Sequence, residues 1–329
     1  MGLDLVRIRP NTGRGRGMKL DVIERLLANL EVGVGAFASC DIRQGHQLTF
    51  EARPAAGVHY CLAGKGALRI RDGKTVEIRQ HSFVLLPPNV IYSLGANEAE
   101  ESDSVPRRRL RAPLFKESVP TIQAGEGQSG IVTVCGEIRF EGVGIPGFFA
   151  QLGEPMIEHF DGPDGLREHF IVLLAESARP QFGTRPLTEA LLKQCLILLL
   201  RRKIERRGAP LPWIAALGDK GLSKALHAIL HRYSEPFTVE TLASIAGMSR
   251  ASFASRFTKA FGQTPICLLR SARLSRAREL LATSDASIDQ IARCVGFSSR
   301  SNFSHAFRQA YEVDPSTFRA GSLVGGEGS

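Results

Sequence analysis

The sequence LASIAG at residues 242–247 recurs as IARCVG at residues 291–296. Each copy reads as a short helix, a turn that contains glycine and a second helix, which is the order of a helix-turn-helix unit. The last third of the chain is therefore predicted to contain two such units. The residues after each copy also match, and the pairs are Phe253 and Phe303, Phe257 and Phe307, Ala260 and Ala310, Phe261 and Tyr311, and Pro265 and Pro315.

Residues that cap helix N-termini stand where these helices should begin. Their side-chain oxygens can accept hydrogen bonds from the backbone N–H groups that the first helical turn leaves unpaired. Thr264-Pro265, an N-cap residue followed by proline, is predicted to begin a long helix that runs to about Ala282. Asp314-Pro315 is the same combination and is predicted to begin another helix. The capping residues of the four shorter helices are Thr238, Ser249, Ser287 and Ser299.

The paired aromatic and alanine residues indicate which face of each second helix is buried. With a period of 3.6 residues they share one face, so the opposite face is exposed. The N-terminal part of that exposed face contacts base edges in a helix-turn-helix unit, where arginine suits guanine and alanine suits the methyl group of thymine. The candidate DNA-contacting residues are Arg250, Ala251, Ala254, Ser255, Arg300, Ser301, Ser304 and His305.

Positive charge is concentrated in the same part of the chain. The formal net charge is +9, and residues 222–320 hold 13 Lys and Arg against 7 Asp and Glu. A basic segment favours a polyanionic partner. We therefore expect double-stranded DNA as the partner.

Residues 222–320 closely resemble the AraC-type family of bacterial transcription regulators, and the stretch from Ile288 to Phe318 is similar to the signature of that family. The resemblance implies two helix-turn-helix units that enter successive major grooves on one face of DNA. It also implies sequence-specific regulation together with RNA polymerase, more often activation than repression. The helix joining the units would be Pro265–Ala282, and its arginines, which could contact DNA or only solvate the bundle, are Arg270, Arg273, Arg276 and Arg278.

The first 145 residues change character several times. Residues 1–17 are polar and rich in Gly and Arg, which predicts a disordered arm. Met18, which could also be the true start, opens a helical pattern. From about Ala36, short β-rich runs alternate with turn signals such as Gly64-Lys65-Gly66.

Residues 96–129 contain clusters of charged residues and several prolines, and they are predicted to form a mobile insertion. Strand character returns after it, at residues 131–134 and 137–140.

Helical patterns follow, of which Leu166–Glu176 and Leu187–Arg206 are the clearest. The second helix has apolar residues around too much of its circumference for a helix that exposes one face to solvent. It must be buried within its own domain or against a second copy, and we expect it to help form a homodimer. No signal-peptide pattern follows Met1 and no apolar stretch could span a bilayer, so no membrane partner and a cytoplasmic location are expected.

Residues 58–64, 83–88 and 134–140 resemble the cupin-type sensor barrel of one AraC subgroup. The predicted fold class is therefore α+β, with an N-terminal cupin-like β-barrel and helical dimerisation segment and a C-terminal all-α double helix-turn-helix domain. The predicted boundaries are 1–17 for the arm, 18–145 for the barrel, 146–210 for the dimerisation segment, 211–221 for a linker, 222–320 for the DNA-binding domain and 321–329 for a disordered tail.

A cupin barrel raises the possibility of a metal enzyme. The candidate ligands are His46, His59 and His81, but the paired His-x-His with a following Glu is absent and Tyr92 stands where a late histidine would be useful. No phosphate-binding loop and no nucleophile–base set is present. We therefore expect no cofactor, no metal and no catalysed reaction.

The thiols are better sensor candidates. Cys40 lies just before the barrel strands and Cys135 on a late strand, and similar regulators of the subgroup carry cysteines at matching places. A thiolate flanked by arginine would be reactive, and Arg43 and Arg139 are near in sequence. Two buried structural cysteines remain the alternative, and Cys267 and Cys294 are predicted to be packing residues.

The sequence thus predicts a regulator whose barrel senses an unknown small molecule, an oxidant or an electrophile. One alternative is a cupin-type metal enzyme with an appended DNA-binding module, which a metal assay would detect. Another is an architectural DNA-binding protein, whose affinity would not depend on DNA sequence.

Overall fold

The computed structural model describes residues 14–28, 30–71, 73–96, 108–110, 119–141, 152–161, 165–206 and 211–324. These residues form two compact units. Helix α1 (Arg14–Ala28) and the helices from α5 onward make up one unit, and the strands with helices α3 and α4 make up the other. The part of the predicted arm before residue 14 lies outside the described residues.

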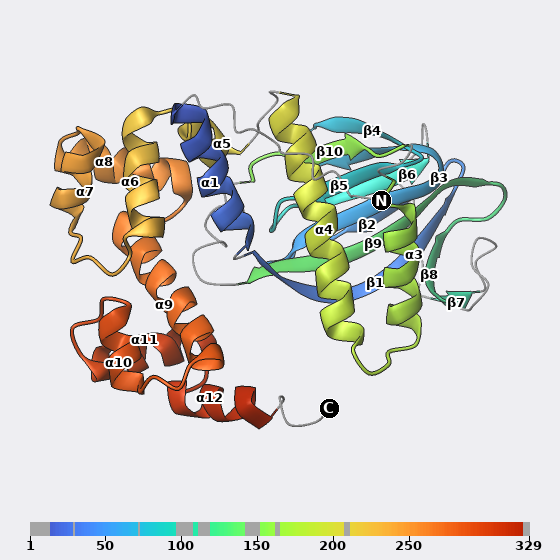
Figure 1. Cartoon of the computed structure of the whole chain (residues 1–329). Coiled ribbons are helices and arrows are strands. Elements are labelled where there is room, and N and C mark those ends of the chain that lie inside the picture. The colour runs from blue at the N-terminus through green and yellow to red at the C-terminus, as the bar shows by residue number, and fades with distance from the viewer. Residues whose placement is uncertain are drawn as a thin grey trace, which may run out of the picture. The chain divides into compact units, whose positions relative to one another are not determined.

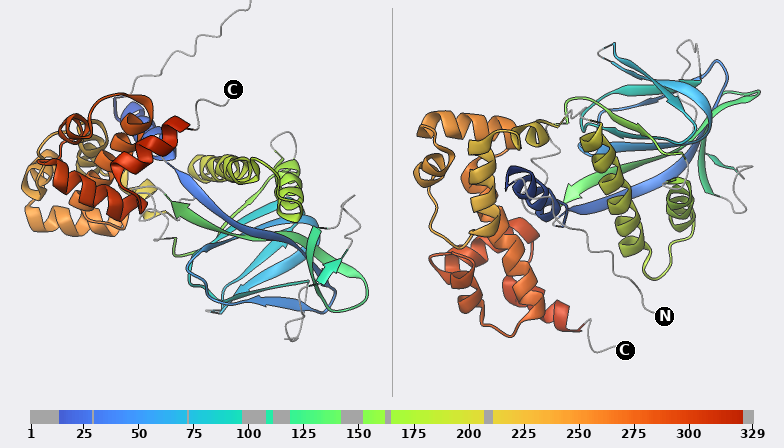
Figure 2. Two further views of the ribbon diagram at one scale, coloured as in Figure 1. Left: turned by 90° about the horizontal axis from the view of Figure 1, so that it is seen from below. Right: turned by 45° about the horizontal axis from the view of Figure 1, so that its top comes forward.

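The strand unit is a curled half-barrel, which confirms the predicted cupin-like architecture (Figure 2). One run of paired strands has the order β10-β5-β3-β9-β1-β8-β7, and β2, β4 and β6 pair beside β3 on the other side. The strands are β1 (Glu31–Arg43), β2 (Gln47–Phe50), β3 (Ala56–Ile70), β4 (Thr75–Arg79), β5 (Ser82–Leu86), β6 (Tyr92–Ala96), β7 (Arg108–Leu110), β8 (Val119–Ala124), β9 (Ser129–Glu141) and β10 (Met156–His159).

Strand β3 differs from the prediction, because the turn expected at Gly64-Lys65-Gly66 does not exist. The chain continues through these residues and passes from pairing with β5 and β9 to pairing with β4 and β6. Gly64 has a φ of 79°, and a Cβ there would lie 2.1 Å from the carbonyl oxygen of Gly130. The glycines thus permit a bend and a close approach within one strand rather than a hairpin.

Two of the strands fall within the stretch that was predicted to be a mobile insertion. Strand β8 pairs in parallel with β1, from Ser39 opposite Thr121 to Ile42 opposite Ala124, and β7 pairs with β8. Residues 97–107 and 111–118 lie outside the described residues. Strand β10 likewise lies in the segment that was expected to be helical, and it pairs with β5.

Helices α3 (Arg167–Ala178) and α4 (Thr184–Glu205) pack against each other, and both contact β1 (Figure 1). Helix α4 buries most of its apolar residues within its own unit, since it also contacts β10. Of the two explanations for its apolar sequence, burial in the domain therefore accounts for the larger part. The fully buried side chains are Leu192, Cys195, Leu196, Leu199 and Leu200.

The other unit consists of helices, and α1 packs on α6 within it (Figure 1). The helices are α5 (Pro212–Ala216), α6 (Lys220–His231), α7 (Val239–Ala246), α8 (Arg250–Phe261), α9 (Pro265–Thr283), α10 (Ile288–Cys294), α11 (Arg300–Tyr311) and α12 (Pro315–Val324). Thus α7 with α8 and α10 with α11 form the two predicted helix-turn-helix units, and α9 joins them. No helix in the described part of the chain is long and apolar enough to span a membrane.

The predicted caps explain where these helices begin. The side chains of Thr238, Ser249, Thr264, Ser287 and Ser299 each accept a hydrogen bond from a backbone N–H of the first turn. Asp314 differs, because its carboxylate accepts two hydrogen bonds from Arg308 instead.

The predicted burial of the second helices is correct except near the end of α11. Phe253, Phe257 and Phe261 of α8 are fully buried. In α11, Phe303 and Phe307 are buried but Ala310 is exposed, and Ala306 is buried in its place. The core around α11 thus lies slightly toward the start of the helix compared with the prediction.

Candidate DNA interface and sensor cavity

Helix α8 presents its candidate residues on an accessible face. Arg250, Ala251 and Ser255 are exposed and Ala254 is half-buried. The Nε atom of Arg250 lies 2.8 Å from a carboxylate oxygen of Glu240 on α7. Arg250 is therefore oriented by its own helix-turn-helix unit, and contact with a phosphate or base would compete with Glu240.

Helix α11 presents the equivalent residues with more polar side chains. Arg300, Ser301 and His305 are exposed and Ser304 is half-buried. No described residue forms an ion pair with Arg300. Its guanidinium is thus available for the bidentate pairing that specifies guanine in the major groove.

The arginines of α9 have intramolecular partners. Arg273 donates hydrogen bonds of 2.7 Å to the backbone carbonyls of Tyr233 and Glu235, beyond the end of α6. Arg276 pairs with Glu279, and Arg270 donates to Gln309. Arg273 therefore stabilises the bundle, which agrees with the structural alternative for this helix.

The half-barrel encloses a cavity of about 260 Å³ beside Cys135. Its wall includes Phe50, His59 and Tyr92, and the rings of Phe50 and Tyr92 stack with centroids 4.8 Å apart. Arg53 and Glu137, 3.0 Å apart and partly exposed, also line it. The cavity can thus admit a small molecule to the thiol.

Cys135 lies in a buried hydrogen-bonded network. Its Sγ is 3.1 Å from Nδ1 of His59 and 3.0 Å from Oγ1 of Thr133, and Nε2 of His59 is 2.7 Å from the hydroxyl of Tyr92. The strand register explains this, because His59 of β3 stands opposite Cys135 of β9. Cys40 hydrogen-bonds Cys135 from the neighbouring strand.

The network makes Cys135 acidic. Burial alone would raise the pKa of this thiol, but the hydrogen bond from Cys40, the charge and hydrogen bond of His59 and the hydroxyl of Thr133 outweigh burial, so the pKa is lowered. Two other buried cysteines behave oppositely, since burial raises the pKa of Cys61 and of Cys195 to about 12. Cys135 therefore has the thiolate character that nucleophilic cysteines need.

The thiol of Cys135 was predictable from the sequence, but the groups around it were not. Arg43 binds Asp41 and the carbonyl of Gly127, and Arg139 is exposed, whereas the activating side chain is His59. His59 and Cys135 become neighbours only through strand pairing, which no local pattern indicates. The prediction that Cys267 and Cys294 are packing residues is wrong, because both are exposed.

The three barrel histidines serve separate roles. His46 contacts the carbonyl of Gln44 through Nδ1, His81 contacts the hydroxyl of Tyr60, and His59 belongs to the Cys135 network. Within the described ranges, they are not among the side chains whose ligand atoms converge as a metal site would require.

Both units match models of known protein domains. A cupin model matches residues 21–205, and a helix-turn-helix domain model matches residues 242–321. The HTH-type transcriptional regulator AlkR of Acinetobacter baylyi is 32% identical over 275 residues, which cover 82% of this chain and 89% of that protein. The RCS-specific HTH-type transcriptional activator RclR of Escherichia coli is 26% identical over 79% of this chain and 83% of that protein.

A solved structure also matches the C-terminal unit. The DNA-binding domain of AdpA, crystallised with a target DNA, is 34% identical and covers 33% of this chain and 98% of that chain, with a TM-score of 0.32. A cupin unit followed along the chain by two helix-turn-helix units defines a DNA-binding transcription regulator. The chain belongs to the AraC family of helix-turn-helix transcription regulators.

Proposed function

We propose that this regulator activates transcription from promoter DNA, in the cytoplasm and together with RNA polymerase, when an oxidant or electrophile modifies Cys135. The observation that carries the proposal is the lowered pKa of Cys135 beside a cavity, in contact with a second thiol. The relative RclR is named an RCS-specific activator, which agrees with a reactive effector. Catalysis has no part in the proposal.

The proposed chemistry needs only the two thiols and the oxidant. The thiolate of Cys135 attacks the chlorine of hypochlorous acid, so that an S–Cl bond forms, the O–Cl bond breaks and hydroxide leaves. The thiol of Cys40 then displaces chloride and gives up its proton, and an S–S bond forms. Cys40 suits this role because it stands opposite Thr133, two residues from Cys135 on the same face of the sheet.

We also propose that two copies associate through the end of the α3–α4 pair. Phe182, in the turn between these helices, is fully exposed, and Val172 and Leu187 are 37% and 43% exposed. Large exposed apolar side chains can mark association surfaces. A two-fold dimer would also match paired promoter half-sites.

A promoter reporter tests the thiol proposal. Wild-type protein, Cys40→Ser and Cys135→Ser are compared before and after hypochlorous acid, with Cys267→Ser as the control because that thiol is exposed in the DNA-binding unit. The induced response should disappear in Cys135→Ser, weaken in Cys40→Ser and persist in Cys267→Ser. If both barrel variants respond like wild type, thiol sensing is wrong and a non-covalent ligand in the cavity becomes the explanation.

A further inference from the structure

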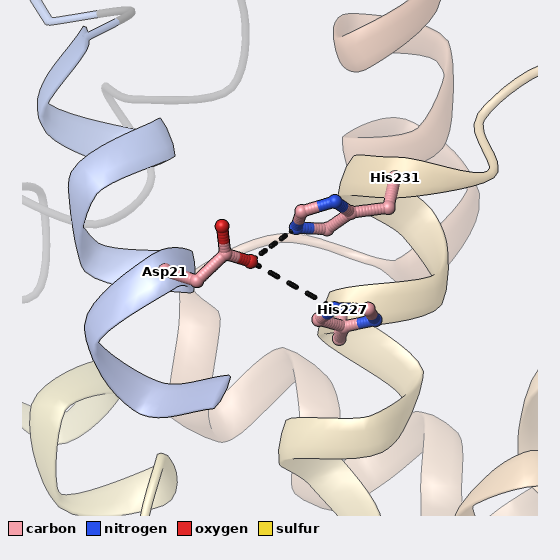
Figure 3. Close-up of side chains that lie close together, drawn as sticks. All are labelled: Asp21, His227 and His231. Carbon is pink, nitrogen blue, oxygen red and sulfur yellow. Dashed lines mark ion pairs between the residues drawn. The ribbon is translucent and has the colours of Figure 1, made fainter. Parts of the chain in front are cut away.

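Three side chains with metal-binding atoms converge within the helical unit. Asp21 lies on α1, and His227 and His231 lie one turn apart on α6 (Figure 3). One ligand atom from each residue lies within 4.8 Å of the others. Histidines four positions apart project from the same helix face, which is the spacing of many helical zinc sites.

The distances suit a shared ion. The Oδ2 atom of Asp21 is 2.6 Å from Nε2 of His231 and 3.7 Å from Nε2 of His227. Ligand atoms of a tetrahedral zinc ion at bond lengths of about 2.0–2.2 Å are separated by about 3.3–3.6 Å. The two observed separations bracket this range, so small side-chain rotations would bring the ligand atoms to equal spacing.

The two imidazole rings face one carboxylate. The rings stack with centroids 4.0 Å apart and planes 14° apart. The Nε2 atom of His231 is shielded from solvent and faces the carboxylate of Asp21.

We propose that Asp21, His227 and His231 bind a divalent transition-metal ion of the zinc class, which fastens α1 to the first long helix of the DNA-binding unit. Two imidazole nitrogens and one carboxylate oxygen form a donor set that zinc prefers, and water would take the fourth position. The side chains of Asp21 and His227 are 45% and 37% exposed, so an ion can enter from solvent. No local pattern in the sequence indicates this site, because Asp21 and His227 are distant in sequence.

The test uses Co²⁺ as a spectroscopic probe of the reduced, chelator-treated full-length protein, with Zn²⁺ as competitor. One equivalent should bind with the visible bands of nitrogen and oxygen coordination and without a thiolate charge-transfer band. His227→Gln and His231→Gln should each weaken binding at least tenfold, since loss of a supporting residue alone costs about 10–100-fold. His46→Gln, a histidine of the barrel, is the matched control and should bind as wild type does.

A second measurement guards against misfolded variants. Zn²⁺ should slow amide hydrogen exchange in α1 of the wild type and not in His231→Gln, while exchange in α8 and α11 without metal is the same in both. Lack of stoichiometric binding, unchanged affinity in His227→Gln, or a charge-transfer band that disappears in Cys135→Ser would each overturn the proposal. The last result would place the ion in the barrel.

Discussion

Arg300 stands at the first turn of α11 with an exposed guanidinium and no ion-pair partner in the described part of the chain. Arg250, at the matching position of α8, is held by Glu240. The two helix-turn-helix units are therefore unequal although their sequences repeat. We expect base-specific contacts with guanine to come mainly from α11.

Replacing Arg300 with alanine should weaken binding to the cognate site by about 1–3 kcal/mol and relax discrimination at one base pair, because a bidentate contact to guanine is lost. The measurement is a competition titration with cognate and scrambled duplexes at one salt concentration. Arg293→Ala is a suitable control, since that side chain pairs with Asp289 on its own helix. Equal losses on both duplexes would reassign Arg300 to a phosphate contact.

Cys135 should react with iodoacetamide faster at neutral and mildly acidic pH than Cys61 or Cys195. Its lowered pKa keeps the thiolate populated as the pH falls below the ordinary thiol range, whereas the thiols with pKa values of about 12 stay protonated. Mass spectrometry of the labelled peptides gives the rate at each pH. His59→Gln should move the rate profile of Cys135 to higher pH; an unchanged profile would contradict the role given to His59.

The sequence predicted what local chemistry determines and missed what strand pairing determines. Caps such as Ser249 and Ser299 act within three residues, so they located the helices correctly. The partner of Cys135 depends on the register of β3 against β9, which joins residues far apart in the chain. The glycines at 64 and 66 resembled a turn locally, but the tertiary pairing of β3 uses them for a close approach.

Helices α3 and α4 illustrate the same distinction at the level of elements. The apolar sequence of α4 correctly indicated a buried helix, but most of the burial is supplied by α3, β1 and β10. The large apolar side chains that stay exposed on these helices and the turn between them are Phe182, Val172 and Leu187. The dimer proposal therefore rests on the end of the helix pair and not on the length of α4.

The double variant Phe182→Ser/Leu187→Ser should shift the full-length protein from dimer toward monomer, because it removes exposed apolar surface that a second copy would cover. Sedimentation at micromolar concentration measures this. Ile266→Ser is the control, since Ile266 is similarly exposed, at 40%, but belongs to α9. Wild-type protein that is already a stable monomer, or a double variant that remains dimeric, would rule out this surface.

For the whole molecule, we expect the formal net charge of +9 to supply attraction to any DNA, and the exposed faces of α8 and α11 to supply sequence preference. Two helix-turn-helix units joined by one helix should bind two short DNA sequence elements on one face of the duplex. Non-specific attraction falls with salt, so the two contributions can be separated only at a fixed salt concentration.

Selection of binding sites from random-sequence DNA, with the reduced full-length protein at physiological salt, measures whether the two helix-turn-helix units recognise a sequence. We expect enriched DNA with two conserved elements whose centres lie about one helical turn, roughly 10 base pairs, apart. The selected sites should bind at least about 10³-fold more tightly than unselected DNA. Enriched pools without a shared sequence, or equal affinity for selected and unselected DNA, would contradict sequence-specific recognition by the two helix-turn-helix units.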